Sequence, residues 1–304
     1  MKRFLKKLYL TILGLFIDKK LTILRVDGGI CSQIQQYAFG QILDKSNLKY
    51  DITWFRYNGY DMLHKDKRNY DLEKLFPYLK VPKASISEVN YYREKYVTEE
   101  QSIEKIKQIT TPICLDGYYT IPHNKYQALY NQLFNFDNFV LDEKNAEFVE
   151  KIRLCKNSCG VHVRRGDLAD KKIQQSSAGY SHGNCSDSYF FKAIDYISKN
   201  FENITFFFFS DDVEYVKNNL ISNIKNNNCI IADINSPEYG YYDLYLLAQC
   251  NHQIASIGSL GITGHLLNKY PEKILITNNA KVTDMVKKCV LLDNDGKLIS
   301  TYCI

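Results

Sequence analysis

The spacing of the hydrophobic positions changes along the chain. In the first half, an apolar run at residues 22–26 predicts a strand that ends at Gly28 and Gly29. Apolar residues then recur at helical spacing up to Leu43, and Ser32 is the expected N-cap of that helix. The same spacing rules give further strands at residues 49–54 and 113–119 and a helix at residues 123–134.

The second half alternates regularly between strand and helix patterns, after a mostly helical segment at residues 137–156. Strands are expected at residues 160–164, 204–209, 229–234, 253–256 and 273–277, with helices at residues 188–200, 213–220, 243–250 and up to 268. This alternation predicts an α/β fold with a parallel, doubly wound sheet. With 304 residues, the chain is long enough for two domains, which we expect at residues 21–150 and 151–304 after an N-terminal segment, residues 1–20.

Polar clusters follow three of the expected strands, at residues 162–167, 210–212 and 256–261. Ligands of doubly wound sheets bind at the carboxyl ends of the strands. The first cluster contains Arg164 and Arg165, and a guanidinium group grips phosphate with a planar, bidentate fork. We interpret the cluster as a nucleotide-sugar site, in which one arginine neutralises a diphosphate and the other holds the loop. The alternative is a structural salt bridge to Asp167.

Two further groups in these clusters have more than one interpretation. His162 is expected on the face of its strand opposite Val161 and Val163, where it either contacts a ribose or base or is satisfied by the backbone. Asp211 and Asp212 can accept hydrogen bonds from a guanine edge, hold a metal or cap a helix. We expect one of these two carboxylates to cap and the other to be free for ligand.

Glycines mark three expected turns. Gly258, Ser259 and Gly261 open a helix whose N–H groups can hold a phosphate. The Gly28–Gly29 pair also precedes a helix, but without a GxGxxG fingerprint. Residues 293–295 have an acidic DxD pattern, although Asp295–Gly296 between apolar runs more simply predicts a hairpin turn.

Composition narrows the class of protein. A formal net charge of +5 with no continuous basic face argues against a nucleic-acid-binding protein. The nine cysteines show no zinc-site spacing, so we interpret them as reduced thiols of a cytoplasmic protein.

The first 20 residues are basic and apolar. Four basic residues (Lys2, Arg3, Lys6 and Lys7) precede the apolar run at residues 8–17, which is shorter than the roughly 20 residues needed to span a bilayer. Asp18 and two lysines follow this run instead of a small-residue cleavage site. Two interpretations stay open: a basic helix resting on an anionic membrane, and a helix packed on the domain.

The motifs together resemble the bacterial α-1,2-fucosyltransferases of glycosyltransferase family 11. The run from His162 to Leu168 resembles the HxRRGDY-type motif of that family, and residues 207–214 resemble its FIFSDD segment. Residues 28–40 resemble its N-terminal GGLGNQMFQYAFG segment. The resemblance runs in order over residues 23–277.

This resemblance implies two Rossmann-like domains (the GT-B fold), with the acceptor side in the first domain and the GDP-sugar in the second. It also implies metal-independent, inverting transfer of L-fucose from GDP-fucose, with no cofactor, to a hydroxyl of a bacterial surface glycan, O-2 of a galactoside. A lipid-linked acceptor and peripheral contact with the inner membrane would suit the basic N-terminus. By the same analogy, the catalytic residues are Arg164, Arg165 and Asp167, and the donor-binding residues are Gly28, Gly29, Gln33, His162, Arg164, Asp211, Asp212 and Ser259.

The chain also departs from the family pattern. Cys31–Ser32 replaces a Gly-Asn pair, and residues 257–264 lack the pair of tryptophans that ends a serine-rich run in the family. These departures keep two alternatives open, a transferase for another GDP-sugar and a catalytically silent GDP-sugar or glycan-binding protein. Asp27, Asp116 and His123 are candidates for the general base, and the sequence does not choose among them.

Overall fold

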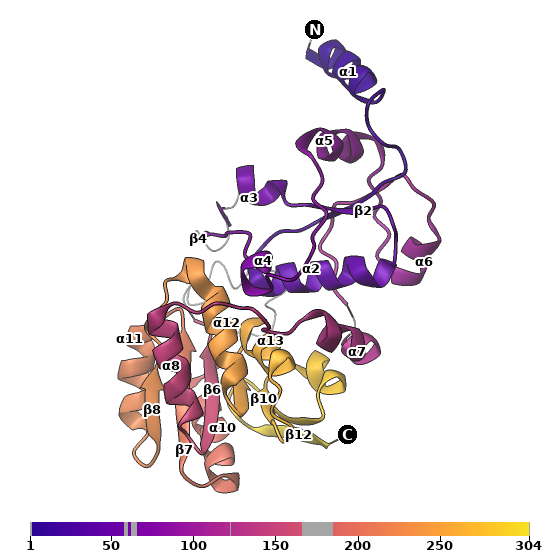
Figure 1. Cartoon of the computed structure of the whole chain (residues 1–304). Coiled ribbons are helices and arrows are strands. Elements are labelled where there is room, and N and C mark those ends of the chain that lie inside the picture. Colours follow the sequence, from indigo (N-terminus) through magenta and orange to yellow (C-terminus); the bar gives the residue numbers. More distant parts are fainter. Residues whose placement is uncertain (1, 58–59, 62–65, 122, 166–184, 304) are drawn as a thin grey trace. The chain divides into compact units, whose positions relative to one another are not determined.

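A computed structural model describes residues 2–57, 60–61, 66–121, 123–165 and 185–303. The chain forms two compact units: residues 1–61 with 65–122, called unit 1, and residues 62–64 with 123–304, called unit 2. The sequence had placed a boundary at residue 150, whereas this division falls after residue 122. Each unit has its own sheet, parallel in unit 1 and mostly parallel in unit 2, and Figure 1 shows the helices around each one.

Unit 1 is built around the buried strand β1 (Thr22–Arg25), which lies between β2 (Leu48–Asp51) and β5 (Ile113–Leu115). Both pairings are parallel. The remaining elements of the unit are α1 (Lys2–Leu13), α2 (Ile30–Leu43), α3 (Thr53–Tyr57), the short hairpin β3 (Tyr60–Asp61) and β4 (Asp66–Lys67), α4 (Leu72–Leu75), α5 (Ile86–Lys95) and α6 (Ile103–Gln108).

Three expected boundaries in unit 1 were wrong, and one of them is the end of the strand expected at residues 113–119, which stops as β5 at Leu115. The helix α2 begins at Ile30 with Gly29 as its N-cap, so Ser32 lies in the first turn and does not cap it. The strand β2 stops at Asp51 instead of continuing to residue 54. The Asp51 carboxylate accepts hydrogen bonds from the Thr53 amide (2.8 Å) and hydroxyl (2.6 Å), and this local turn ends the strand and starts α3.

The sheet of unit 2 has the strand order β12-β11-β10-β9-β6-β7-β8. Its strands are β6 (Asn157–Val163), β7 (Ile204–Ser210), β8 (Asn228–Ile231), β9 (His252–Ala255), β10 (Leu275–Thr277), β11 (Lys288–Leu292) and β12 (Leu298–Cys303). All neighbouring pairs are parallel except β11 with β12. Counted along the chain from β6, the parallel strands follow the order 3-2-1-4-5-6, which is that of a Rossmann fold. The order reverses between β6 and β9, so the switch point lies there.

The helices of unit 2 match the expected alternation. They are α7 (His123–Leu133), α8 (Glu143–Arg153), α10 (Asp187–Asn200), α11 (Val213–Tyr215) continued by the turns η2 (Val216–Leu220) and η3 (Ile221–Asn223), η4 (Pro237–Tyr239), α12 (Gly240–Gln249), α13 (Leu260–Leu267) and η5 (Ala280–Met285). The expected hairpin turn is confirmed, since the Asp293 amide donates to the Lys297 carbonyl (2.9 Å) and Gly296 has φ +83°.

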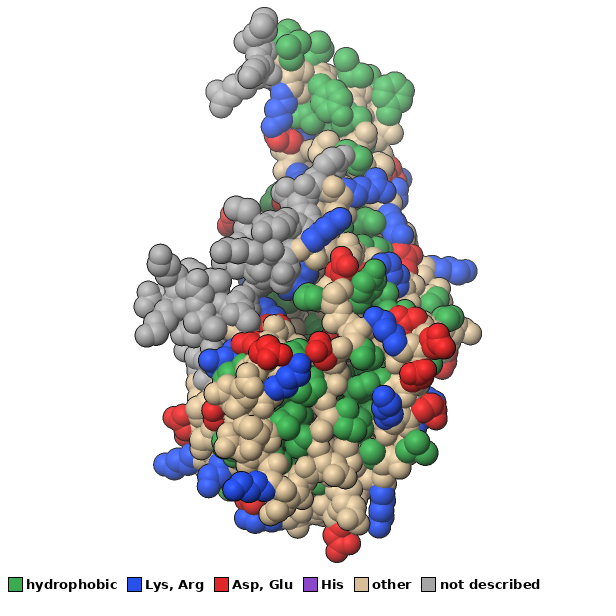
Figure 2. Space-filling view, turned by 90° about the vertical axis from the view of Figure 1, so that its left-hand side faces the viewer, with side chains coloured by type: hydrophobic (Ala, Val, Ile, Leu, Met, Phe, Trp, Pro, Cys, Tyr) green, Lys and Arg blue, Asp and Glu red, His purple; other side chains and the backbone are tan. Residues whose placement is uncertain are grey.

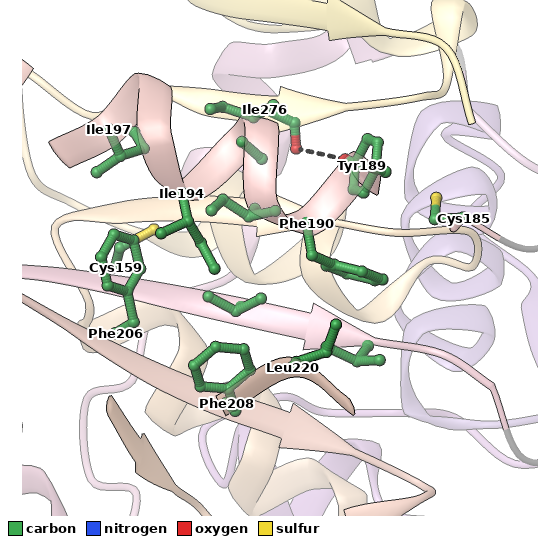
Figure 3. Packing of buried hydrophobic residues seen from close by; sticks show 14 of the residues in the cluster. Cys159, Cys185, Tyr189, Phe190, Ile194, Ile197, Phe206, Phe208, Leu220 and Ile276 are labelled. Carbon is green, nitrogen blue, oxygen red and sulfur yellow. Dashed lines mark hydrogen bonds between the residues drawn. The ribbon is translucent and has the colours of Figure 1, made fainter. Parts of the chain in front are cut away.

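The core of unit 2 explains the apolar run of four phenylalanines in β7. Phe206 and Phe208 pack under α10 in the cluster of Figure 3, while Phe207 and Phe209 contact Phe148 of α8 on the other face. A strand buried on both faces is uniformly apolar. The buried Tyr189 of α10 points its hydroxyl at the sheet and donates to the Ala255 carbonyl (2.7 Å), which helps to fix the end of β9.

Every helix in the described ranges is too short or too polar to span a lipid bilayer.

Candidate functional site

The carboxyl ends of three neighbouring strands meet at one edge of the unit 2 sheet. His162 of β6 pairs with Phe209 of β7 on one side and with Ala255 of β9 on the other. The segments that follow these strands therefore converge, and they carry the three polar clusters that the sequence had singled out. This edge includes the switch point between β6 and β9, the place where doubly wound sheets bind their ligands.

Arg164 is fixed by both neighbouring strand ends. Its backbone amide donates to the Ser256 hydroxyl (2.9 Å), which follows β9. Its guanidinium Nη1 donates to Asp211 Oδ2 (2.5 Å), which follows β7. The side chain is 19% exposed, so this charge-assisted contact is partly shielded from water. Arg164 thus lies directly at the switch point with a set orientation.

Arg165 is held on the other side, by the helix that follows β7. Its amide donates to Asp211 Oδ1 (2.9 Å), and its Nε lies 3.7 Å from Asp212 Oδ2. Its guanidinium carbon lies 3.6 Å from the centre of the Tyr215 ring, a cation–π contact. The Tyr215 hydroxyl in turn donates to the Asp187 carboxylate of α10. The expectation that one arginine of the pair holds the loop stays a prediction, because the residues that follow Arg165 lie outside the described part of the chain.

The two aspartates after β7 have different partners. Asp212 caps α11, because its Oδ1 accepts from the Tyr215 amide (3.0 Å). Ser210 connects the strands: its hydroxyl donates to the Val163 carbonyl (2.8 Å) and accepts from the Asp212 amide (3.0 Å). One aspartate caps, as expected. Asp211, however, does not stand free for a ligand, since it binds Arg164 and the Arg165 amide.

His162 is buried beneath this edge, with 5% of its surface exposed. Burial lowers the pKa of its imidazole to about 4; Asp211 opposes this shift and Arg164 adds to it. The ring is therefore neutral at pH 7. Its Nδ1 atom has no hydrogen-bond partner in the described part of the chain. Within the described residues the backbone therefore does not satisfy this atom, and both interpretations of the histidine stay predictions.

The turn after β9 needs its glycines. Gly258 has φ +102°, a conformation that disfavours other residues. A Cβ atom on Gly261 would lie 2.8 Å from Ala255 Cβ and 2.9 Å from His162 Cβ, so this glycine lets α13 approach the ends of β6 and β9. Ser259, the N-cap of α13, is exposed at the start of that helix. The α13 N-terminus is therefore present where a phosphate-binding amide group was expected.

The other expected donor-binding residues lie in unit 1. Gly28 has φ +75° and Gly29 is the N-cap of α2. The Gln33 side chain is fully buried and joins two backbone segments. Its Nε2 donates to the carbonyls of Gly28 (3.2 Å) and Asn69 (2.8 Å), and its Oε1 accepts from the amides of Asp71 (2.9 Å) and Leu72 (3.1 Å). In unit 1 Gln33 therefore ties the glycine turn to the backbone of residues 69–72 through hydrogen bonds.

The candidate general bases in unit 1 surround Arg25. Both Asp27 oxygens are engaged: Oδ1 accepts from Gln36 Nε2 (2.8 Å), and Oδ2 lies 2.9 Å from Arg25 Nη2. Asp116 approaches Arg25 and Arg93 through Oδ1, at 3.4 Å from each. His123 is the first residue of α7 in unit 2, and the structure does not describe its side chain.

Asp167, the remaining expected catalytic residue, also lies outside the described residues. Within the described parts of the chain, no group of three or more His, Cys, Asp or Glu side chains could hold a metal ion.

Sequence reasoning missed two residues that orient the arginines. Ser256 was noted only as part of a polar cluster, although its buried hydroxyl accepts a hydrogen bond from the Arg164 amide. Tyr215 looked like an ordinary helix residue, and only the fold places its ring under Arg165.

Comparisons with known proteins agree with this architecture. The model of the family described as "Glycosyl transferase family 11" matches residues 79–290. The chain is 27% identical over 277 residues to an alpha-1,2-colitosyltransferase of Escherichia coli, covering 84% of this chain and 90% of that protein. It is 24% identical over 288 residues to the O-antigen biosynthesis glycosyltransferase WbnK of Escherichia coli, covering 83% and 92%.

A solved structure of the NodZ alpha-1,6-fucosyltransferase, co-crystallised with GDP, has a similar fold. The TM-score is 0.51 at 14% identity, over 94% of this chain and 99% of the other. The expected GT-B fold class, with parallel α/β units, is confirmed.

Proposed function

The chain belongs to glycosyltransferase family 11, and we propose that it transfers L-fucose from GDP-fucose to a bacterial surface glycan. The acceptor group in this proposal is a hydroxyl, O-2 of a galactoside, and the reaction inverts the configuration at the sugar carbon. The relatives support a surface-glycan acceptor, because one of them is named for O-antigen biosynthesis. The fucosyltransferase that shares the fold, co-crystallised with GDP, supports a guanosine diphosphate sugar as donor.

The position of Arg164 is the observation that carries the proposal. Its guanidinium lies at the switch point of the Rossmann-like sheet, held by Asp211 and, through its backbone, by Ser256. The N-terminus of α13 begins at the same edge. A cation and a helix N-terminus at one strand edge form a site suited to the diphosphate of a nucleotide sugar. His162 and Asp211 would lie near the guanosine part of such a donor.

During the reaction, negative charge develops on the diphosphate as it leaves the sugar. The bond between the sugar carbon and the diphosphate oxygen breaks, and GDP leaves with the electron pair. A new bond forms from the acceptor oxygen to the opposite face of the sugar carbon. Arg164 and the α13 amides would stabilise the negative charge that develops on the leaving phosphate oxygen, because preorganised donors aimed at such a charge lower the barrier.

We propose that these groups serve in place of a metal ion. A guanidinium group neutralises phosphate charge bidentately. Arg165 adds a second positive charge next to Arg164 and is held by Tyr215 and Asp212. Turnover is therefore expected to persist in EDTA. A requirement for a divalent ion would contradict this part of the proposal.

The proton of the acceptor hydroxyl must go to a base. We propose Asp116 over Asp27, because both oxygens of Asp27 are engaged by short contacts, whereas the contacts of Asp116 are long and made through Oδ1. An Asp116→Asn variant should keep GDP affinity and lose transfer. Normal transfer by Asp116→Asn would remove Asp116 from this role.

A colitosyl donor is the second candidate. The relative at 27% identity is named a colitosyltransferase, and residues 257–264 depart from the fucosyltransferase pattern where α13 begins. Colitose lacks one ring hydroxyl of fucose. A pocket that hydrogen-bonds this hydroxyl would discriminate strongly between the two donors.

Donor choice is tested by GDP release from a panel of GDP-sugars, including GDP-fucose and GDP-colitose, with β-galactoside acceptors and EDTA. Turnover of GDP-fucose alone supports the first candidate. Turnover of GDP-colitose alone supports the second. Tight GDP binding without turnover of any donor would indicate a binding protein and contradict both.

A further inference from the structure

The N-terminal helix α1 presents an apolar face that is exposed among the described residues of unit 1. Sixteen large hydrophobic side chains are exposed in the described part of the chain, and seven of them fall in residues 4–16. They are Phe4 (70% exposed), Leu5 (55%), Leu8 (47%), Tyr9 (51%), Ile12 (50%), Leu15 (76%) and Phe16 (83%). Figure 2 shows apolar side chains gathered over α1. We call these seven residues the α1 patch.

The five patch residues within α1 share one face of the helix, and Leu15 and Phe16 lie in the turn that follows Leu13. Phe4, Leu8 and Ile12 recur every four residues, and Leu5 and Tyr9 lie beside them. The opposite side of the helix packs against unit 1. Leu10 is buried in a cluster with Leu21, Val89 and Tyr92, and Leu13 packs against the same cluster.

The helix is fixed to unit 1 by close contacts. A Cβ atom on Gly14 would lie 2.7 Å from the Tyr91 hydroxyl, so the chain passes tightly over α5 there. The Tyr92 hydroxyl donates to the Asp18 carbonyl (2.7 Å) and accepts from the Leu21 amide (2.9 Å). Lys6 forms an ion pair with Glu94. The α1 patch is therefore a surface held in place by folding, and both sequence interpretations of the segment are compatible with it.

The charge around the patch is one-sided. Residues 1–20 contain six of the 39 basic residues and one of the 34 acidic residues, which gives this segment a formal charge of +5. The rest of the chain holds 33 of each, so its formal charges cancel. Lys7, Lys19 and Lys20 are exposed. The formal net charge of the chain is thus concentrated in the segment that carries the α1 patch, which holds seven of the sixteen exposed large hydrophobic side chains of the described residues.

We propose that the α1 patch binds the surface of an anionic lipid bilayer, with α1 lying in the plane of the interface. An apolar helix face flanked by lysines is the arrangement that inserts at the boundary between headgroups and acyl chains. Lysines near an anionic surface add electrostatic attraction. A two-fold contact with a second copy would instead bring two segments of +5 together, which disfavours that occupant.

The helix α1 is shorter than the hydrocarbon core of a bilayer. Twelve helical residues extend about 18 Å, against a hydrocarbon core of about 30 Å. The inference goes beyond the transferase activity and does not depend on it, because lipid binding needs neither donor nor acceptor.

The test is co-sedimentation of the full-length protein with lipid vesicles. We expect at least tenfold stronger binding to phosphatidylcholine vesicles with about one third phosphatidylglycerol than to phosphatidylcholine alone, with the difference reduced at about 1 M salt. A Leu15→Asp/Phe16→Asp variant should lose at least tenfold of this binding and keep its urea midpoint, because both side chains are exposed.

The matched control is Val140→Asp/Leu154→Asp, which changes two equally exposed apolar residues of unit 2 (79% and 84%) and should bind like the wild type. Replacing Lys7, Lys19 and Lys20 with Gln should weaken binding to the anionic vesicles selectively. Absence of binding by the wild type would overturn the proposal, as would equal binding by Leu15→Asp/Phe16→Asp. A wild-type dimer that becomes monomeric in that variant, without vesicle binding, would show that a second copy occupies the patch.

Discussion

Arg164 Nη1 lies 2.5 Å from Asp211 Oδ2, in a contact that joins the ends of β6 and β7. Asp211 also accepts from the Arg165 amide through Oδ1 (2.9 Å), so one carboxylate fixes both the side chain of the first arginine and the backbone of the second. A diphosphate bound at this edge would share the Arg164 guanidinium with Asp211. The aspartate thus orients the arginine before the donor arrives, which lowers the cost of ordering it during the reaction.

Asp211→Asn should therefore slow transfer without unfolding the protein. The amide oxygen can still accept from the Arg165 amide, but the charge that orients Arg164 is lost. Hydrogen bonds to charged groups contribute about 1.5–3 kcal/mol, so we expect a reduction in kcat of about ten- to a hundredfold. Steady-state GDP release measures it, and an unchanged kcat would show that Asp211 does not orient the arginine.

Gly261→Ala should disturb the packing of α13 against the ends of β6 and β9. The added Cβ would lie within 3 Å of Ala255 and His162 Cβ atoms, so α13 must shift away from the strand ends. Overpacking of this kind costs about 1–3 kcal/mol. Urea unfolding and GDP affinity should both report the loss.

The matched control is Gly240→Ala, at the start of α12, where a Cβ atom meets nothing within 4 Å. That variant should be as stable as the wild type or slightly more stable. Equal stability of the Gly261 and Gly240 variants would contradict the close approach of α13.

Asp243→Asn should change how stability depends on pH. Burial raises the pKa of the Asp243 carboxyl to about 7, while a hydrogen bond from Asn235 partly opposes this shift. A raised folded-state pKa means that the folded protein holds the proton more tightly than the unfolded chain. The contribution of Asp243 to wild-type stability is therefore lost as pH rises from about 4 to about 7.

The asparagine variant lacks this titration, so its stability relative to the wild type should increase with pH over that range. The increase is up to about 1.4 kcal/mol for each pH unit and levels off above about pH 7. Urea unfolding of both proteins at several pH values measures the difference. A difference that is constant with pH would mean that Asp243 titrates normally.

Tyr215→Leu tests the expectation that Arg165 holds the loop. The substitution removes the ring that lies 3.6 Å from the Arg165 guanidinium, whereas Tyr215→Phe keeps it. A cation–π contact contributes about 0.5–2 kcal/mol, so the leucine variant should lose about two- to thirtyfold in kcat and the phenylalanine variant much less. Equal losses would assign the effect to the hydroxyl contact with Asp187 instead.

Much of unit 2 could be predicted from the sequence, because its elements follow strong periodic patterns. The run of phenylalanines in β7 is apolar on both faces, and this is the signal of a buried parallel strand. In unit 1 the expected β2 ran three residues too long. Tyr50 and Trp54 look like strand residues, and the hydrogen bonds from Thr53 to Asp51 that end the strand have no hydrophobic signature.

The sequence predicted where the site residues lie in the fold, but not which side chains they contact. The strand ends identified Arg164, His162 and Asp211 as neighbours, since parallel strands bring their carboxyl ends to one edge. The sequence gives no means to assign Asp211 to Arg164 rather than to a ligand, because that pairing depends on the register between β6 and β7. Gln33 shows the same limit, since its partners lie near residue 70.

The most direct test of the account is turnover by Arg164→Ala, measured as GDP release with the donor that the wild-type protein consumes. Arg153→Ala, an exposed arginine of α8, is the control. We predict that Arg164→Ala keeps its urea midpoint and loses about 10²- to 10³-fold in kcat, as when one preorganised donor to a developing charge is removed, while Arg153→Ala is unchanged. Wild-type turnover by folded Arg164→Ala would contradict the assignment of this sheet edge as the donor site.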